Sequence, residues 1–147
     1  MPRLAIQGED QAVRALVRAA YAHYVPRLGR EPFPMTDDYA ARIASSQAWV
    51  EEQDGALVAA LVLEDTDDGL LIDNIAVAEQ MRGTGIGRRL MQFAEDEARR
   101  RGHRRVWLYT NEKMTENIAL YTRLGYAETH RGEGQGFRRV FMEKPLP

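Results

Sequence analysis

The segment RGTGIG, residues 82–87, constrains the fold more than any other part of the sequence. An apolar run, LLIDNIAV at residues 70–77, precedes it, and apolar residues at helical spacing follow it. Its glycines let the backbone turn sharply and expose its N–H groups. A helix that begins at such a turn favours negative charge at its N-terminus. The sequence therefore predicts a strand, a glycine-rich turn and a helix in succession, with a phosphate or pyrophosphate site at the turn.

Two common nucleotide-binding motifs do not fit this turn. A P-loop has Lys followed by Ser or Thr directly after its last glycine, whereas Arg88 and Arg89 follow Gly87. A Rossmann fingerprint needs a third glycine where Arg88 or Leu90 stands. A glycine-rich turn without any ligand stays open as an alternative. Arg82, with Arg88 and Arg89, supplies cations for charge-assisted hydrogen bonds to an anion.

The whole chain, residues 1–147, predicts a single domain of mixed α/β fold class. Helical spacing of apolar residues and turn signals such as Asp54-Gly55 place the elements. We expect a mixed, mostly antiparallel sheet of six to seven strands flanked by about four helices. The expected elements, in order, are a short strand at 3–7, a helix capped by Asp10, a loop over 27–36, a short helix capped by Thr36, strands at 48–53, 56–64 and 70–77, a helix over 86–101, a strand at 105–109, a helix capped by Thr115 and closed by Gly125, and strands at 126–131 and 137–144.

Composition excludes several classes of protein. The chain has no cysteine, so neither disulfides nor thiolate chemistry is available. His23, His103 and His130 lie far apart in the sequence, and we expect no metal site. No run approaches the ~20 apolar residues that a membrane-spanning helix needs, and the N-terminal residues do not resemble a secretory signal. We therefore expect a cytoplasmic protein with no membrane partner.

The formal net charge of -2 hides an uneven distribution. Residues 1–81 hold 14 acidic and 6 basic side chains, and residues 82–147 hold 8 and 14. The basic half suits an anionic ligand and the acidic half suits a cationic partner, but solvated surface charge gives the same totals. The arginines within residues 99–105 stand at a helix end, where the dipole stabilises cations, and no nucleic-acid motif accompanies them. We expect no nucleic-acid partner.

Two segments, RGTGIG at residues 82–87 and NIALYTRLGY at residues 117–126, together resemble motifs of the GCN5-related N-acetyltransferases. The acyl-CoA signature of that family is Arg or Gln, any two residues, Gly, any residue, and Gly or Ala, which Arg82, Gly85 and Gly87 match. NIAV at residues 74–77 looks like the family's central strand, and NIALYTRLGY at residues 117–126 looks like its second motif. Both motifs stand in the family's order and at its usual separation.

The resemblance implies an acyl-CoA-dependent N-acyltransferase that passes the acetyl group of acetyl-CoA directly to an amine. It implies that the central strand pairs with the pantetheine arm, that the turn wraps the pyrophosphate, and that a backbone N–H near Val77 stabilises the oxyanion. Tyr121 is implied as the proton donor to the leaving thiolate, which suits a phenol because it is protonated at neutral pH; a core position on a helix face is the alternative. The residues that the resemblance assigns to acetyl-CoA are Ile75, Ala76, Val77, Arg82, Gly83, Thr84, Gly85, Ile86, Gly87, Arg88 and Asn117.

No motif fixes the general base. Asp73 interrupts an apolar strand just before the cofactor segment, where partial burial would suit a catalytic carboxylate; a hydrogen-bonded position at a sheet surface is the alternative. Glu112 follows the strand at 105–109 and is placed to attract a cationic amine. We expect Asp73 and Tyr121 to be catalytic and Glu112 to bind the acceptor.

The acceptor is expected to be the primary amine of a small molecule or a peptide. Its identity depends on the loop at 27–36 and the turn at 133–136, which the family motifs do not cover. A non-catalytic acyl-CoA-binding module on the same fold remains the alternative, since the turn and the strand explain cofactor binding without guaranteeing chemistry. A homodimer is expected only by analogy with related folds.

Overall fold

The computed structural model describes residues 1–134 and 136–147. The chain forms two compact units, of which the first comprises residues 1–63 and 74–93 and the second comprises residues 64–73 and 94–147. The strand β4 (Gly69–Val77) and the helix α4 (Ile86–Arg100) each contribute residues to both units. The predicted turn at 133–136 includes position 135, which lies outside the described residues.

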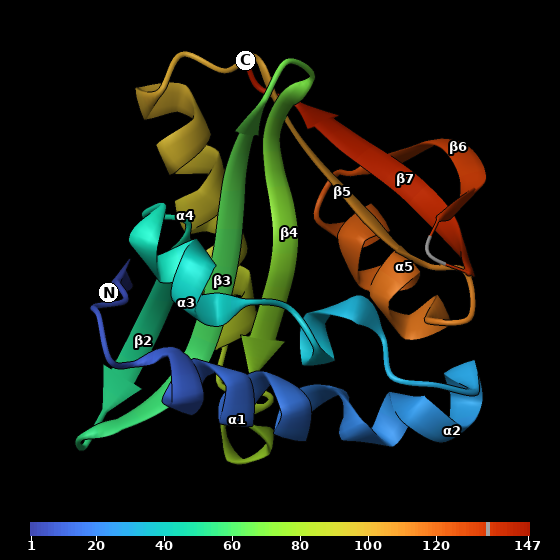
Figure 1. The fold of residues 1–147 in the computed structure, drawn as a ribbon. Helices are drawn as coiled ribbons and strands as arrows, with labels where there is room; N and C mark the ends of the chain where they lie inside the picture. The colour runs from blue at the N-terminus through green and yellow to red at the C-terminus, as the bar shows by residue number, and fades with distance from the viewer. Residues whose placement is uncertain (135) are drawn as a thin grey trace. The chain divides into compact units, whose positions relative to one another are not determined.

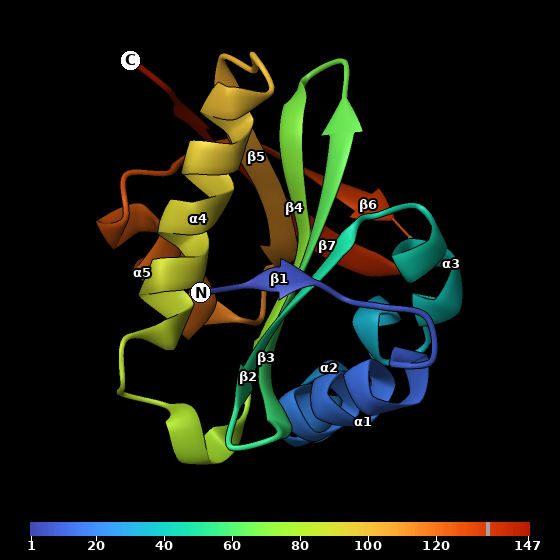
Figure 2. The ribbon, with the colours of Figure 1, turned by 90° about the vertical axis from the view of Figure 1, so that its left-hand side faces the viewer.

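The first unit contains the N-terminal helices and strands (Figures 1 and 2). β1 (Arg3–Leu4) pairs antiparallel with β2 (Ala48–Gln53), which pairs antiparallel with β3 (Ala56–Thr66). The register places Val50 opposite both Arg3 of β1 and Ala60 of β3. The helices are α1 (Asp10–Tyr21), the single turn α2 (Val25–Leu28) and α3 (Tyr39–Ala44).

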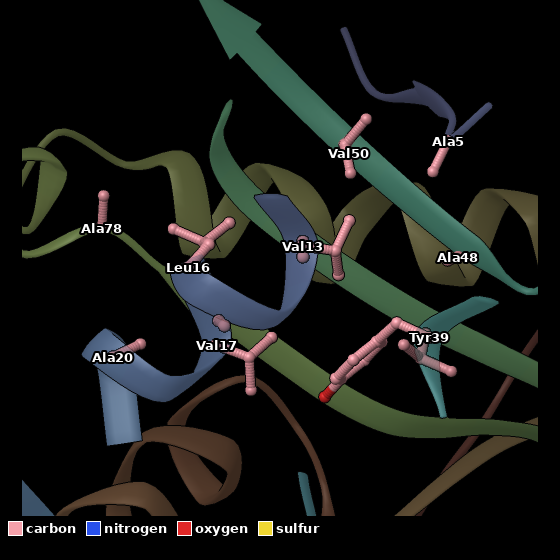
Figure 3. Packing of buried hydrophobic residues seen from close by; sticks show 12 residues of the cluster. Ala5, Val13, Leu16, Val17, Ala20, Tyr39, Ala48, Val50 and Ala78 are labelled. Carbon is pink, nitrogen blue, oxygen red and sulfur yellow. The ribbon is translucent and has the colours of Figure 1, made fainter. Parts of the chain in front are cut away.

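One face of α1 packs against the sheet of this unit, because its apolar residues recur every three or four positions. Figure 3 shows this cluster, in which Val13, Val17 and Tyr39 are fully buried. Burying a Val side chain stabilises the folded state by about 2 kcal/mol, so the cluster fixes α1 and α3 on the strands. Its buried members are Ala5, Val13, Leu16, Val17, Ala20, Tyr39, Ala48, Val50, Ala60, Val62, Ala76 and Ala78.

The second unit contains β5 (Arg105–Asn111), α5 (Thr115–Arg123), β6 (Ala127–Gly134) and β7 (Phe137–Pro145). β5 runs parallel to the first half of β4, with Leu70 opposite Val106. β7 is antiparallel to both β5 and β6. Alternate residues of β5 are buried, as expected for a strand with one face in a core.

The predicted fold class is confirmed. Within the described residues the sheet has seven strands in the order β1-β2-β3-β4-β5-β7-β6, and four helices have six residues or more. Several local predictions were wrong. Asp10 and Thr115 are the first residues of α1 and α5, whose N-cap residues are Glu9 and Met114. The strand expected at 3–7 covers only Arg3–Leu4. The loop at 27–36 contains helical turns at Val25–Leu28 and Phe33–Met35. Asp38, not Thr36, caps α3, because its carboxylate accepts a hydrogen bond from the N–H of Ala41 at 3.1 Å.

A bidentate ion pair joins β1 to the start of α1. Arg3 donates to both carboxylate oxygens of Glu9 at 2.9 and 2.8 Å, and the N–H of Ile6 donates to Oε1 at 2.9 Å. The bonds from Arg3, followed by that from Ile6, lower the pKa of Glu9 from 4.5 to about 2. Because the pKa of Glu9 is lower in the folded state than in the unfolded state, its ionised carboxylate stabilises the fold at pH values above 4.5. This contribution is lost as the pH falls from 4.5 to about 2.

We expect Glu9→Gln to lower the free energy of unfolding by about 1 kcal/mol or less at pH 7, as for other exposed ion pairs. The difference from the parent chain should shrink as pH falls from 4.5 to about 2. Urea denaturation at a series of pH values measures it. Asp67→Asn, at an exposed position, is the control and should show no such dependence on pH. If Glu9→Gln changes the free energy of unfolding by the same amount at every pH, the ionised Glu9 carboxylate does not stabilise the fold through a lowered pKa.

Candidate functional site

The glycine-rich turn stands where the sequence predicts it, between β4 and α4 in the first unit (Figure 2). A short helical turn at Glu79–Met81 leads into it. Gly83 and Gly85 have φ angles of 80° and 89°, a region that L-residues with side chains rarely adopt. The hydroxyl of Thr84 donates to the carbonyl of Met81 at 2.5 Å and holds the turn from inside. Glycine is therefore required at these two positions by backbone conformation.

The turn leaves the N-terminus of α4 open. The N–H of Arg89 donates to the carbonyl of Gly85 at 3.0 Å, which is the first bond of the helix. The N–H groups of Ile86, Gly87 and Arg88 precede that bond and have no helical acceptor. A Cβ at position 85 would meet nothing within 4 Å. Backbone donors, a helix dipole and open space thus coincide, which is what an anionic group needs.

The three arginines around the turn differ in availability. Arg82 and Arg88 are exposed, so both can add charge to an anion site. Arg89 donates from Nη2 to Oε1 of Glu51 at 3.2 Å, and the Glu51 side chain is only 8% exposed. The sequence predicted that all three arginines could bind an anion. Among the described residues, Arg89 has a carboxylate partner, whereas Arg82 and Arg88 have none.

The C-terminal half of β4 precedes the turn and alternates in burial. Asn74 and Ala76 are 3% exposed, whereas Ile75 and Val77 are half-buried. The Tyr21 hydroxyl donates to Oδ1 of Asn74 at 2.8 Å and lies 3.3 Å from the carbonyl oxygen of Ile75. Neither Asn74 nor Tyr21 was among the predicted site residues. A polar residue in an apolar strand was the available signal, but it was assigned to Asp73 alone.

In the second unit, Asp73 lies beside β5. The parallel register pairs Ile72 with Leu108, and the Tyr109 hydroxyl donates to Oδ1 of Asp73 at 3.1 Å. The Arg139 guanidinium lies over the Tyr109 ring, 4.4 Å from its centroid. Asp73 is half-buried, so its carboxylate is hydrogen-bonded and still partly accessible to solvent. This position fits both the catalytic role and the alternative of a hydrogen-bonded residue at the sheet surface. Tyr109 was not identified from the sequence.

Asn117 and Tyr121 are one turn apart on α5 and therefore share a face of that helix. Tyr121 is 9% exposed, and its ring meets that of Tyr126 edge-on, with centroids 6.2 Å apart. Asn117 is half-buried, and its amide lies 3.7 Å from the sulfur of Met114. Burial, followed by the nearby charge of Glu95, raises the pKa of the Tyr126 phenol. The Tyr121 side chain is therefore packed against Tyr126 but keeps a small solvent-exposed area.

Glu112 has two arginine partners. Its Oε2 accepts from Nε of Arg138 at 3.2 Å and lies 3.6 Å from Nη1 of Arg131. The carboxylate is 31% exposed and forms ion pairs with both of these arginines. Its predicted role in attracting a cationic amine would require the amine to compete with both arginines.

Four of the five arginines within residues 99–105 form ion pairs, and Arg99 pairs with Asp96 at 3.3 Å. Arg100 and Arg101 both bind Glu97, at 2.6 and 3.1 Å, and Arg105 binds Glu143 at 2.9 Å. This pairing favours the interpretation of a solvated helix end.

Metal ligands and membrane spans are not evident in the part of the chain that the structure describes. Among residues 1–134 and 136–147, no three His, Cys, Asp or Glu side chains are grouped to hold a metal ion. Over the same residues, no helix combines the length and the apolar character needed to cross a membrane.

Comparisons with curated proteins return acetyltransferases. N-alpha-acetyltransferase 80 of Mus musculus is 36% identical over 92 residues, which are 56% of this chain and 28% of that protein. Streptothricin acetyltransferase of Streptomyces lavendulae is 36% identical over 85 residues, which are 53% of this chain and 45% of that protein. The matched regions span less than half the length of these two relatives.

Solved structures share the fold. The PaiA N-acetyltransferase from Thermoplasma acidophilum, in complex with coenzyme A, has a TM-score of 0.84 at 14% identity, with 99% of this chain and 98% of that chain covered. The ribosomal-protein-S18-alanine N-acetyltransferase from Escherichia coli has a TM-score of 0.75 at 22% identity, with 99% and 92% covered. At these identities the likeness concerns the fold.

The model of the acetyltransferase (GNAT) family matches residues 12–126. That range contains the central strand, the glycine-rich turn and both residues singled out on α5, so the motifs and the family match agree. This chain belongs to the acetyltransferase (GNAT) family.

Proposed function

We propose that residues 1–147 act as one N-acetyltransferase domain that transfers acetyl from acetyl-CoA to the primary amine of a small molecule or a peptide. The observation that carries the proposal is the open N-terminus of α4 behind a turn with two left-handed glycines. The relatives named N-alpha-acetyltransferase 80 and streptothricin acetyltransferase support this class of acceptor. Homodimerisation and a cytoplasmic location stay predictions.

The residues around the turn fit the anionic part of coenzyme A. The N–H groups of Ile86, Gly87 and Arg88 are available to phosphate oxygens, and Arg82 adds a cation. The backbone groups of Ile75–Val77 are proposed to pair with the amide-containing arm, with Asn117 as a further contact. Acetyl-CoA supplies the activated acetyl group as a thioester.

Three groups of this chain are proposed to serve the transfer. The Asp73 carboxylate, held by the Tyr109 hydroxyl, accepts the proton that the amine loses when it forms the new C–N bond. The N–H near Val77 donates to the acetyl oxygen as negative charge develops there. The Tyr121 hydroxyl gives a proton to the sulfur when the C–S bond breaks. No cysteine exists to carry the acetyl group, which is consistent with direct transfer.

A thiol-release assay tests the proposal. The parent chain with acetyl-CoA should release free thiol in the presence of at least one of an aliphatic diamine, an amino-acid amide and an alanine-initiated peptide, and calorimetry should detect CoA binding. CoA binding without release on any amine would support the binding-module alternative. Absence of CoA binding would overturn the whole proposal.

We expect Asp73→Asn to lower kcat about 100-fold, the lower end of the contribution of a positioned general base, with CoA affinity unchanged within threefold. Tyr109→Phe should lower kcat by a smaller factor, because it removes only the hydroxyl that orients the carboxylate. Asp54→Asn in the β2–β3 turn is the control, since Asn tolerates its left-handed backbone (φ 53°). An unchanged kcat for Asp73→Asn excludes this carboxylate as the base.

A further inference from the structure

A chain of hydrogen bonds runs through the buried cluster of the first unit. The Tyr21 hydroxyl donates to Oδ1 of Asn74 at 2.8 Å, and Nδ2 of Asn74 donates to the Tyr39 hydroxyl at 3.1 Å. The Tyr39 hydroxyl in turn donates to the carbonyl of Pro34. Three side chains thus connect the end of α1, the strand β4 and the start of α3.

Because these groups are buried, the loss of any bond in the chain destabilises the fold. Asn74 is 3% exposed and Tyr39 is fully buried (Figure 3). At such positions each broken bond leaves a buried polar group without its protein partner, which costs free energy. One direction of donation satisfies all members. If the amide of Asn74 were reversed, the Tyr39 hydroxyl would donate to it and the Pro34 carbonyl would lose its donor.

The bonded residues bracket the segment at 22–38, which contains the loop on which acceptor identity was predicted to depend. The hydrogen bonds of this segment at Gly29, Met35 and Thr36 reach only three or four residues back along the chain. Tyr21 and Tyr39 stand at its two ends, and Pro34 lies within it. Arg18 of α1 also holds the segment, because it donates to the Met35 carbonyl at 3.0 Å and to the Glu31 carboxylate at 2.7 Å. Asn74 links the two ends of the segment to β4 through Tyr21 and Tyr39.

The same strand continues directly into the proposed cofactor segment. The Tyr21 hydroxyl that binds Asn74 lies 3.3 Å from the Ile75 carbonyl, the first residue proposed to pair with the donor. A single hydroxyl proton serves one of these oxygens fully, and the shorter distance favours Asn74. The Tyr21 hydroxyl thus contacts both Asn74, which is linked to the acceptor segment, and the backbone of the donor strand at Ile75.

We propose that Asn74 is a positioning residue that holds the acceptor segment, residues 22–38, in register with the donor strand. The inference rests on the proposed function, and it assigns the acceptor to residues 22–38 and acetyl-CoA to the donor strand. It predicts that loss of Asn74 disturbs acceptor binding while donor binding persists, because the turn and the N-terminus of α4 are not part of the hydrogen-bond chain.

The test compares Asn74→Ala with Val17→Ala. Val17 is fully buried in the same cluster on α1 and makes no side-chain hydrogen bond, so its truncation loosens the packing alone. With the amine that shows turnover in the panel above, Asn74→Ala should raise the acceptor KM about tenfold and change the calorimetric CoA Kd less than threefold. Val17→Ala should leave both within threefold. Equal effects of the two variants on acceptor KM would overturn the proposal, as would no effect of Asn74→Ala.

Hydrogen–deuterium exchange gives a readout that needs no acceptor. With CoA bound, Asn74→Ala should accelerate amide exchange across residues 22–38 by at least fivefold more than Val17→Ala does. Tyr21→Phe and Tyr39→Phe remove single hydroxyls and should shift exchange in the same direction if Asn74→Ala does not fold. CoA binding with unchanged exchange refutes the positioning role alone, whereas failure of the parent chain to bind CoA refutes the proposed function.

Discussion

Gly85→Val should weaken CoA binding about 100-fold or more. Position 85 has a φ of 89°, and a β-branched residue is strongly disfavoured there. The backbone would therefore leave this conformation and carry the N–H groups of the α4 N-terminus away from the bound phosphate. A loss of two to three backbone hydrogen bonds to a charged group, at about 1.5 kcal/mol or more each, accounts for the expected factor. Calorimetry with CoA measures it.

Gly87→Ala is the matched control within the same turn. Gly87 has an ordinary backbone conformation, and a Cβ there would lie 3.8 Å from Cγ2 of Val77, a normal contact distance. The family signature also admits Ala at this position. Replacing Gly by Ala inside a helix is stabilising by about 0.5–1 kcal/mol, so thermal stability should rise slightly and CoA affinity should stay within threefold. Equal affinities for Gly85→Val and the parent chain would remove the cofactor assignment.

The turn was predictable because its determinants are local. Spacing of glycines over six residues specifies a backbone conformation without reference to distant parts of the chain, and Gly83 and Gly85 adopt it. The same holds for the helical pattern of α1 and for the hairpin turn at Asp54-Gly55, both of which depend on neighbours in sequence. The fold class followed from these local signals.

The partners of the site residues were not predictable, because they come from distant positions. Tyr21 and Asn74 are 53 residues apart, and Tyr39 and Asn74 are 35 apart. Adjacent residues of a strand point to opposite faces, so Asp73 and Asn74 cannot share one environment, and the sequence does not say which of them is buried. Glu112 illustrates the same limit, since both of its arginines belong to the later strands β6 and β7.

Tyr121→Phe should lower kcat about 100-fold, the lower end of the contribution of a positioned general acid, and leave the CoA Kd within threefold. The thiolate leaves poorly without a proton donor, so the loss should shrink when the acetyl group is offered on a more acidic thiol. The ring keeps its packing in the variant, because only the hydroxyl oxygen is removed. Steady-state thiol release from acetyl-CoA and from an acetyl aryl thioester gives the two values of kcat.

Tyr126→Phe separates this chemistry from packing. Tyr126 is 2% exposed, stands edge-on to Tyr121, and its hydroxyl has no hydrogen-bond partner among the described residues. Removing a buried and unsatisfied hydroxyl relieves a desolvation cost of about 1–3 kcal/mol, so this variant should be as stable as the parent chain or more stable, with kcat unchanged. If both variants lose activity equally, the aromatic pair is structural. If neither does, Tyr121 is not the acid and another donor must protonate the sulfur.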